Sequence, residues 1–363
     1  MKIMKKLAAV LAAGVVCVSL AGCHKANEIG LKIGNTEFTS AQYSYALLMA
    51  DSQARSKVDK AKAADTSSGS SDSSAASTSS ETDYLSETVE GVSYTEWVET
   101  KALEMLRTYA KVADDCREKN ITLTQEQKTQ AKSYADYYYS HYEANLTANG
   151  IGKETYRTMT EYGYLQDVYF DTLYGKGGER EIPESDVQAA FREHYRVAYI
   201  LQQDTSSLAE GEAATYLEKL NEYKTRLEAG ESAAVISAEN ENKEASEVGE
   251  EISVLSVLSD PDFDSNYACE FWDQVKDLSA GTVTILDDSE KGGYIRLVKI
   301  YDSSADEKYL EQTDTAIRYA LKHEDFENDL AQQAAQLEVT KFKSALKPFT
   351  VKKIKYASTS SAS

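Results

Sequence analysis

The chain has 363 residues and a formal net charge of −21 at pH 7. That length is enough for about two or three domains. The acidic balance argues against nucleic acid as a partner, because nucleic-acid binding depends on basic patches. It also argues against electrostatic adhesion to an anionic bilayer.

Residues 1–22 have the pattern of a secretory signal peptide. Three lysines precede an apolar run from Leu7 to Ala21, which is shorter than the ~20 residues that a membrane-spanning helix needs. The segment Leu20-Ala21-Gly22-Cys23 resembles the lipobox of bacterial lipoproteins. The resemblance implies a lipid on Cys23, a tether over 23–28 and an extracytoplasmic protein that is anchored to the cell membrane. The alternative is a plain signal peptide with a chance cysteine.

The segment after the tether predicts a strand, a turn and a helix. Apolar residues alternate over 29–33, which is typical of a strand. Gly34-Asn35 predicts a turn into a short second strand. Thr39 and Gln42 form a capping-box pattern, so a helix is expected from there to about Lys62.

A low-complexity segment interrupts this region. Residues 65–82 are mostly Ser, Thr, Ala, Gly and Asp, and such a segment buries too little apolar surface to offset its ordering entropy. We therefore expect a disordered loop here. Helices are expected to resume over about 94–119, 124–149 and 153–174, and a short one over about 182–195.

The pattern changes at Val197. Strands are predicted over about 197–201, 254–258, 282–286 and 294–301, and helices over about 210–229 and 268–278. Strands mixed with helices over 191–303 indicate a compact α+β domain.

The last part of the chain is helical again. Two helices are expected between Ser304 and Pro348, followed by a strand over Phe349–Tyr356 and a disordered tail over 358–363. Strand patterns at both ends suggest that 304–357 pack on the N-terminal region. The predicted fold class is α+β, with a mainly helical domain over 29–190 that is completed by the C-terminal helix and strand.

This order of elements resembles the PrsA/SurA class of extracytoplasmic foldases. The stretches that carry the resemblance are Leu31–Thr39, Ile182–Tyr195, Phe271–Ile300 and Phe349–Tyr356. It implies a SurA/PrsA-like N-domain with an inserted parvulin-like (PpiC-type) peptidyl-prolyl isomerase domain over 191–303.

The parvulin pattern is degenerate where its chemistry would occur. In that family a histidine in the first strand precedes Ile and Leu, and here Tyr199 takes its place. A second histidine usually follows Gly-Tyr, and here Ile295 or Arg296 follows Gly293-Tyr294, depending on the alignment. Prolyl isomerisation needs a cleft that binds the twisted imide more tightly than the planar one. We therefore expect little or no catalysis.

The resemblance still suggests residues for the degenerate cleft. The candidates are Tyr199, Leu201, Phe271, Tyr294 and Arg296. Tyr199 has two interpretations, a hydrogen-bonding replacement for the histidine or ordinary core packing.

Other chemistry has little support in the sequence. The four histidines include no pair at helical spacing for a metal, and there is no phosphate loop, so no metal or cofactor is expected. Cys116 and Cys269 are predicted to be small buried side chains. A disulfide between them is the alternative.

The predicted function is that of a membrane-anchored folding helper that holds unfolded exported polypeptides without ATP. Its candidate client-binding residues are Tyr134, Tyr138 and Tyr142, on a helix that is crowded with tyrosines. Packing against the C-terminal helix is the alternative for that cluster. Two other functions stay open, an active prolyl isomerase with an atypical site and a structural or ligand-binding surface lipoprotein. A homodimer also stays open.

Overall fold

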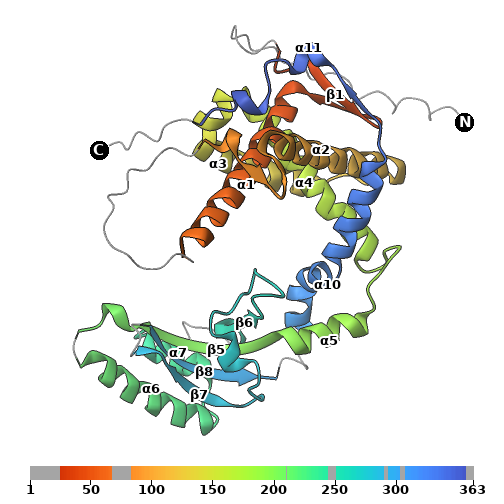
Figure 1. The fold of residues 1–363 in the computed structure, drawn as a ribbon. Helices are drawn as coiled ribbons and strands as arrows, with labels where there is room; N and C mark the ends of the chain where they lie inside the picture. The colour runs from red at the N-terminus through yellow and green to blue at the C-terminus, as the bar shows by residue number, and fades with distance from the viewer. Residues whose placement is uncertain are drawn as a thin grey trace, which may run out of the picture. The chain divides into compact units, whose positions relative to one another are not determined.

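The computed structural model describes residues 25–67, 83–209, 211–243, 251–289, 293–302 and 307–356 (Figure 1). The predicted signal peptide, the lipid site at Cys23, most of the loop 65–82 and the tail 358–363 lie outside the described residues, and those predictions stay predictions. The chain divides into two compact units, Met1–Tyr169 with Glu327–Ser363 (unit 1) and Phe170–Phe326 (unit 2).

Unit 1 is mainly helical. Its helices are α1 (Ser40–Ser67), α2 (Tyr94–Lys119), α3 (Gln125–Ala148), most of α4 (Lys153–Tyr174), the end of α10 (Glu307–Ala335) and the short α11 (Lys343–Leu346). Its strands are β1 (Ile29–Ile33), β2 (Thr36–Thr39), β3 (Thr88–Val89), β4 (Val92–Ser93) and β9 (Val339–Lys341). Among the described residues, β2, β1 and β9 form an antiparallel sheet in that order.

The sheet joins the two ends of unit 1. Gly34 has a φ of +55°, which suits glycine, in the turn between β1 and β2. Leu31 and Phe38 are fully buried on these strands. The Phe342 N–H donates a hydrogen bond of 2.9 Å to the Gly30 carbonyl beside β9. A C-terminal strand therefore does return to the N-terminal domain, but it is β9 and not the predicted segment Phe349–Tyr356.

The strand predicted over Phe349–Tyr356 is wrong. Those residues are all described and contain no strand; Val351–Lys353 form a 3₁₀ turn. In such a turn, residues three apart lie on the same side, and Val351 is buried while Ile354 packs partly against the same core. Val351 and Ile354 are thus apolar because they pack on the core from a turn, and their spacing resembles the imperfect alternation of a strand.

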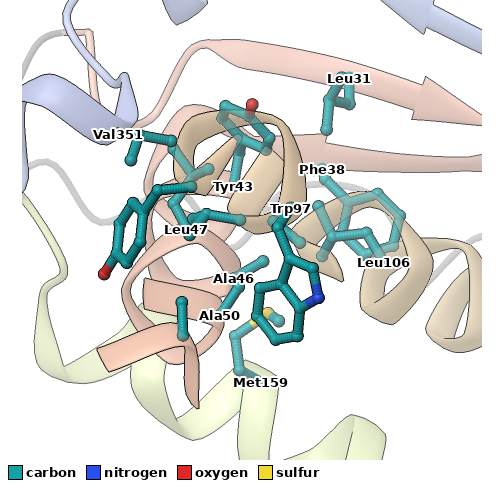
Figure 2. Close-up of a cluster of buried hydrophobic side chains, with 14 of the residues drawn as sticks. Leu31, Phe38, Tyr43, Ala46, Leu47, Ala50, Trp97, Leu106, Met159 and Val351 are labelled. Carbon is teal, nitrogen blue, oxygen red and sulfur yellow. The ribbon is translucent and has the colours of Figure 1, made fainter. Parts of the chain in front are cut away.

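The core of unit 1 lies between α1 and α2. Figure 2 shows Trp97 and Leu106 of α2 among Ala46, Leu47 and side chains of neighbouring elements. Tight helix contact follows from the small residues of α1, because alanine lets the backbones approach closely. This packing fixes the helices on which α3 and α4 rest.

Unit 2 has an α+β architecture (Figure 1). It contains α5 (Glu184–His194), β5 (Tyr195–Asp204), α6 (Glu212–Glu228), α7 (Ala233–Asn240), β6 (Leu255–Ser259), α9 (Trp272–Val275), β7 (Val283–Asp287) and β8 (Tyr294–Tyr301). Its described strands form an antiparallel sheet in the order β6-β5-β8-β7. Side chains of α6 and α7 pack on one face of this sheet, and α9 packs on the other.

Three predicted helices differ from the structure. The two helices expected after Ser304 are one helix, α10, and its sequence has neither Gly nor Pro to end it early. The helix expected over 268–278 is only α9. The Cys269 N–H bonds to the Ser259 carbonyl, and Ala268 bridges to Ser259. Residues 268–269 are therefore held at the end of β6 and cannot join a helix.

The α+β class is confirmed. The predicted domain boundaries at residues 191 and 303 both fall within unit 2, and the domain assignment stays a prediction. Within the described residues, no helix has both the length and the apolar character needed to span a bilayer.

Candidate functional site

α3 carries a cluster of exposed aromatic rings. We call Tyr134, Tyr137, Tyr138, His141 and Tyr142 the tyrosine surface. Tyr134, Tyr137 and Tyr142 are 49%, 59% and 52% exposed, and Tyr138 is half-buried. The ring centroids of Tyr134 and Tyr138 lie 4.4 Å apart, and those of Tyr137 and Tyr138 lie 5.1 Å apart. Residues three and four apart on a helix share a face, so this spacing gathers the rings on one side.

The opposite side of α3 holds the helix in place. Ala131, Ala135, Tyr139 and Leu146 are its buried residues, and Tyr139 and Leu146 pack in a cluster with Leu48 of α1. A capping box between Thr124 and Gln127 begins the helix. The tyrosine surface is therefore presented by a rigid element.

An ion pair links α3 to α4. The Arg157 guanidinium donates two hydrogen bonds to the Asp136 carboxylate, at 2.6 and 2.8 Å. Bidentate pairs of this kind fix orientation as well as distance. Arg157 and Lys132 hold the pKa of Asp136 well below its usual value. Asp136 is thus ionised at neutral pH, and the pair persists there.

Tyrosine rings suit weak contact with many sequences. Each offers an apolar ring and a polar tip. Burial and the neighbouring Tyr138 raise the pKa of Tyr134 above the usual tyrosine value, so its hydroxyl stays protonated and able to donate a hydrogen bond. The surface can therefore take both apolar side chains and polar backbone groups of a partner.

The structure separates the tyrosines that the sequence grouped. Tyr134 and Tyr142 are exposed, so the alternative of packing against the C-terminal helix does not hold for them. Tyr139 is the buried member and contacts the Tyr156 ring. Tyr137, the most exposed of the group, is not one of the three candidate residues, although its position three after Tyr134 and four before His141 places it on the same face. The client-binding role stays a prediction.

The candidate cleft residues Tyr199 and Leu201 face the helices α6 and α7. Tyr199 is 2% exposed and packs with Leu220 and Tyr223. Burial raises the pKa of Tyr199. Its hydroxyl lies near Ser237 but makes no hydrogen bond of normal geometry in the described residues. These surroundings fit the second interpretation of Tyr199, ordinary core packing, and not a hydrogen-bonding replacement for the histidine.

Phe271, Tyr294 and Arg296 lie on the opposite face of the same sheet. The Arg296 guanidinium stacks over the rings of Phe271 and Tyr294, at 4.6 Å from each centroid. Its Nε donates to Gln202 at 3.2 Å, and an ion pair of 3.5 Å reaches Asp288. The structure brings these three candidates together but not with Tyr199 and Leu201, so the five do not line one cleft.

Cys116 and Cys269 are buried free thiols, as predicted, and they form no disulfide with each other. Burial, reinforced by Asp115, raises the pKa of the Cys116 thiol to about 11. Burial also raises the pKa of Cys269. Since the thiolate is the reactive form, neither is suited to act as a nucleophile. Over the described part of the chain, no group of three or more His, Cys, Asp or Glu could hold a metal ion.

Comparison with known proteins gives a weak structural likeness. No family model and no curated protein matches this chain. It is similar to the foldase protein PrsA from Lactococcus lactis, at 15% identity and a TM-score of 0.38, over 71% of this chain and 90% of that one. PrsA from Streptococcus pneumoniae gives 15% identity and a TM-score of 0.38, over 73% and 98%. PrsA from Bacillus subtilis gives 14% and 0.31, over 68% and 88%. Similarity at this level carries no inference about function.

Proposed function

We propose that this protein is an extracytoplasmic folding helper that holds unfolded exported polypeptides on its tyrosine surface, and that a lipid on Cys23 anchors it to the cell membrane. The observation that carries the proposal is the exposure of Tyr134, Tyr137 and Tyr142 on one rigid helix. Contiguous exposed apolar groups on a soluble domain mark interaction sites.

Binding on this surface would be weak and reversible. Each aromatic contact contributes about 0.5–1.5 kcal/mol, so three rings together correspond to millimolar affinity at the strongest. A helper without a nucleotide site has to release its client by simple dissociation, which weak contacts permit. Several contacts along one unfolded chain would raise the overall affinity without slowing each single release.

The acidic charge of the chain supports the same role. A net charge of −21 keeps a protein soluble and discourages self-association. A helper that exposes aromatic rings needs such protection, because the rings that bind an unfolded client would also bind one another. Anchoring through Cys23 would place this surface where exported chains emerge.

Unit 2 is proposed to be a parvulin-like domain with little or no catalysis. Its antiparallel four-strand order and its flanking helices are consistent with the α+β domain that the sequence predicted. The burial of Tyr199 at the position of the family's first histidine argues for a structural residue there.

The proposal is tested by the aggregation of a reduced, unfolded secreted protein. We expect the wild-type chain at equimolar concentration to slow aggregation, and the triple variant Tyr134→Ser, Tyr137→Ser, Tyr142→Ser to lose most of this effect. Serine is matched to tyrosine in helix propensity, so the helix is retained. The control is Leu85→Ser with Phe342→Ser, which removes apolar side chains of similar exposure elsewhere in unit 1.

Two results would overturn the proposal. One is a wild-type protein that never slows aggregation, which would favour a structural or ligand-binding lipoprotein. The other is a triple variant that works as well as the control variant. Circular dichroism and thermal unfolding of each variant show whether the fold is intact, because exposed substitutions usually change stability by less than about 0.5 kcal/mol.

A further inference from the structure

A groove of about 500 Å³ lies among the helices of unit 1. All of its lining residues belong to that unit. They are Ala50 and Gln53 of α1, five residues of α2 from Lys101 to Thr108, Gln166 of α4, and five residues of α10 from Glu327 to Ala335, with Leu330 among them. Its size is in the range of sites that hold a small ligand or a few side chains.

The groove exists because the helices that meet there carry small residues. Ala50 of α1 and Ala331, Ala334 and Ala335 of α10 line it. An alanine at a helix contact leaves unfilled the space that a larger side chain would take. Met105 adds a flexible wall that can adapt to an occupant. The groove therefore has an apolar and adaptable wall among polar lining residues.

Arg107 is the unusual residue of this groove. Its Nε is buried, and it has no hydrogen-bond partner within the described part of the chain. Two other cations of unit 1 are paired: Lys101, in the same groove, bonds Glu104 at 2.7 Å, and Arg157 bonds Asp136. A buried donor without a partner costs free energy, and an apolar wall beside an unpaired guanidinium is complementary to an apolar group that carries a carboxylate.

We propose that this groove binds a polypeptide segment in which an apolar side chain lies next to an Asp or Glu. The apolar side chain would pack on Leu330 and Met105, and the carboxylate would accept hydrogen bonds from Arg107. The inference rests on the proposed function, because the occupant is a segment of an unfolded client chain. It goes beyond that function by giving the client a preferred chemistry.

The test is fluorescence anisotropy with labelled, N-acetylated and C-amidated hexapeptides on the full chain. The probes are Ala-Leu-Leu-Glu-Leu-Ala and the same peptide with Gln or Lys in place of Glu. One charge-assisted hydrogen-bonded contact predicts that the Glu peptide binds about tenfold more tightly than the Gln peptide. The Lys peptide should bind more weakly still.

The variants locate this preference. Arg107→Gln should make the Glu and Gln peptides bind alike, while Lys60→Gln, an exposed cation on α1, should leave the preference intact. Ala331→Phe should weaken all three peptides by filling the groove. Glu327→Gln should keep or strengthen binding of the Glu peptide, because it removes a like charge from the lining.

Several results would overturn the inference. They are equal binding of the Glu and Gln peptides to wild type, a preference that survives Arg107→Gln, or unchanged binding to Ala331→Phe. Marked thermal destabilisation of Arg107→Gln would also overturn it, because it would show that Arg107 has a structural partner. The serine triple variant of the tyrosine surface should keep the peptide preference. The peptide test can therefore contradict the inference about the groove while the aggregation test supports the proposed function of the tyrosine surface, and the reverse is also possible.

Discussion

Asp51 is a buried carboxylate, 2% exposed, that ties together distant parts of unit 1. Tyr94 of α2 donates to it at 2.8 Å, Arg55 of α1 at 2.8 Å, and Tyr356 near the end of the described chain at 2.7 Å. The Arg55 guanidinium also lies over the rings of Tyr84 and Tyr356. A buried charge is tolerated only when it is paired and hydrogen-bonded, and the donors here meet that condition.

The Tyr356 hydroxyl gives the first prediction at this scale. Tyr356→Phe removes one donor from Asp51 and should destabilise the protein by about 1–2 kcal/mol, because bonds to charged groups exceed ordinary ones. Urea unfolding measures the change. Tyr137→Phe is the control, with an exposed ring and an expected change below about 0.5 kcal/mol. Equal effects of the two variants would contradict the role of Asp51.

Tyr199 gives the opposite prediction. Its buried hydroxyl makes no hydrogen bond of normal geometry, so Tyr199→Phe should be neutral or stabilise the protein by up to about 1 kcal/mol. A proline-peptide assay on the full chain should show no acceleration for either form. Acceleration that is lost in Tyr199→Phe would instead show that the residue is catalytic.

At the scale of elements, β9 joins the C-terminal segment to the N-terminal strands of unit 1. Its partner β1 lies in the middle of the sheet, and the Phe342 N–H bonds to Gly30 just beyond β9. Asn149 also holds the C-terminal segment in place. Its side-chain Nδ2 donates to the Lys355 carbonyl, and its Oδ1 accepts from the Lys355 N–H. The C-terminal segment is thus part of the N-terminal fold.

Phe342→Pro tests this closure. Proline removes the donor to Gly30 while the backbone φ of −90° stays near its range. We expect Phe342→Pro to cost about 1–3 kcal/mol more than Phe342→Ala, in unfolding by urea. Because the two variants lose the same ring, the difference reports the backbone bond. Equal stability of the two variants would mean that the hydrogen bond from Phe342 to Gly30 adds little to the stability of unit 1.

The sequence predicts α2 and α3 well because their signals are local. The bounds of α2, from Tyr94 to Lys119, follow from apolar spacing, and those of α3 follow from a capping box and Gly150. It fails for β9 and the turn at Val351–Lys353, where three-residue elements depend on a distant partner. It also missed α7, which is short and rich in alanine.

The same distinction applies to the sites. The tyrosine surface can be predicted because i, i+3 and i+4 spacing on one helix places rings together. The cleft could not be predicted, because it needs the register of β5 and β8. That register pairs Gln202 with Arg296 and places Tyr199 on the other face. No spacing in the sequence carries this information.

At the scale of the whole molecule, the 25 tyrosines should govern stability in alkali. Burial raises the pKa of Tyr43 and of Tyr223 to about 12, and it raises those of Tyr94 and Tyr195 as well. Because these pKa values are higher in the folded state than the ordinary value near 10, the unfolded chain releases its protons first.

The resulting prediction is a loss of stability as pH rises. The contribution of these tyrosines is fully present below about pH 10 and should fall as pH rises from about 10 to 12. Urea unfolding at pH 8, 10 and 11, with tyrosinate absorbance followed in parallel, measures it. A free energy of unfolding that stays constant over this range would contradict the burial of these side chains.

The tyrosine surface, the acidic charge and the predicted anchor act together in the proposed function. The rings would bind clients weakly, and the net charge of −21 would keep copies of the protein from associating with one another. A lipid on Cys23 would hold the protein at the membrane. In the proposed function, holding and placement would contribute more than catalysis.

Site-specific photocrosslinking tests this claim most directly. Tyr137 and, as the control, Phe342 are each replaced by p-benzoylphenylalanine in the full chain, and each protein is irradiated with an unfolded or a folded form of one secreted client. We predict strong crosslinks from position 137 to the unfolded client, few to the folded client and few from position 342. Equal crosslinking at the two positions, or to both client forms, would contradict the account.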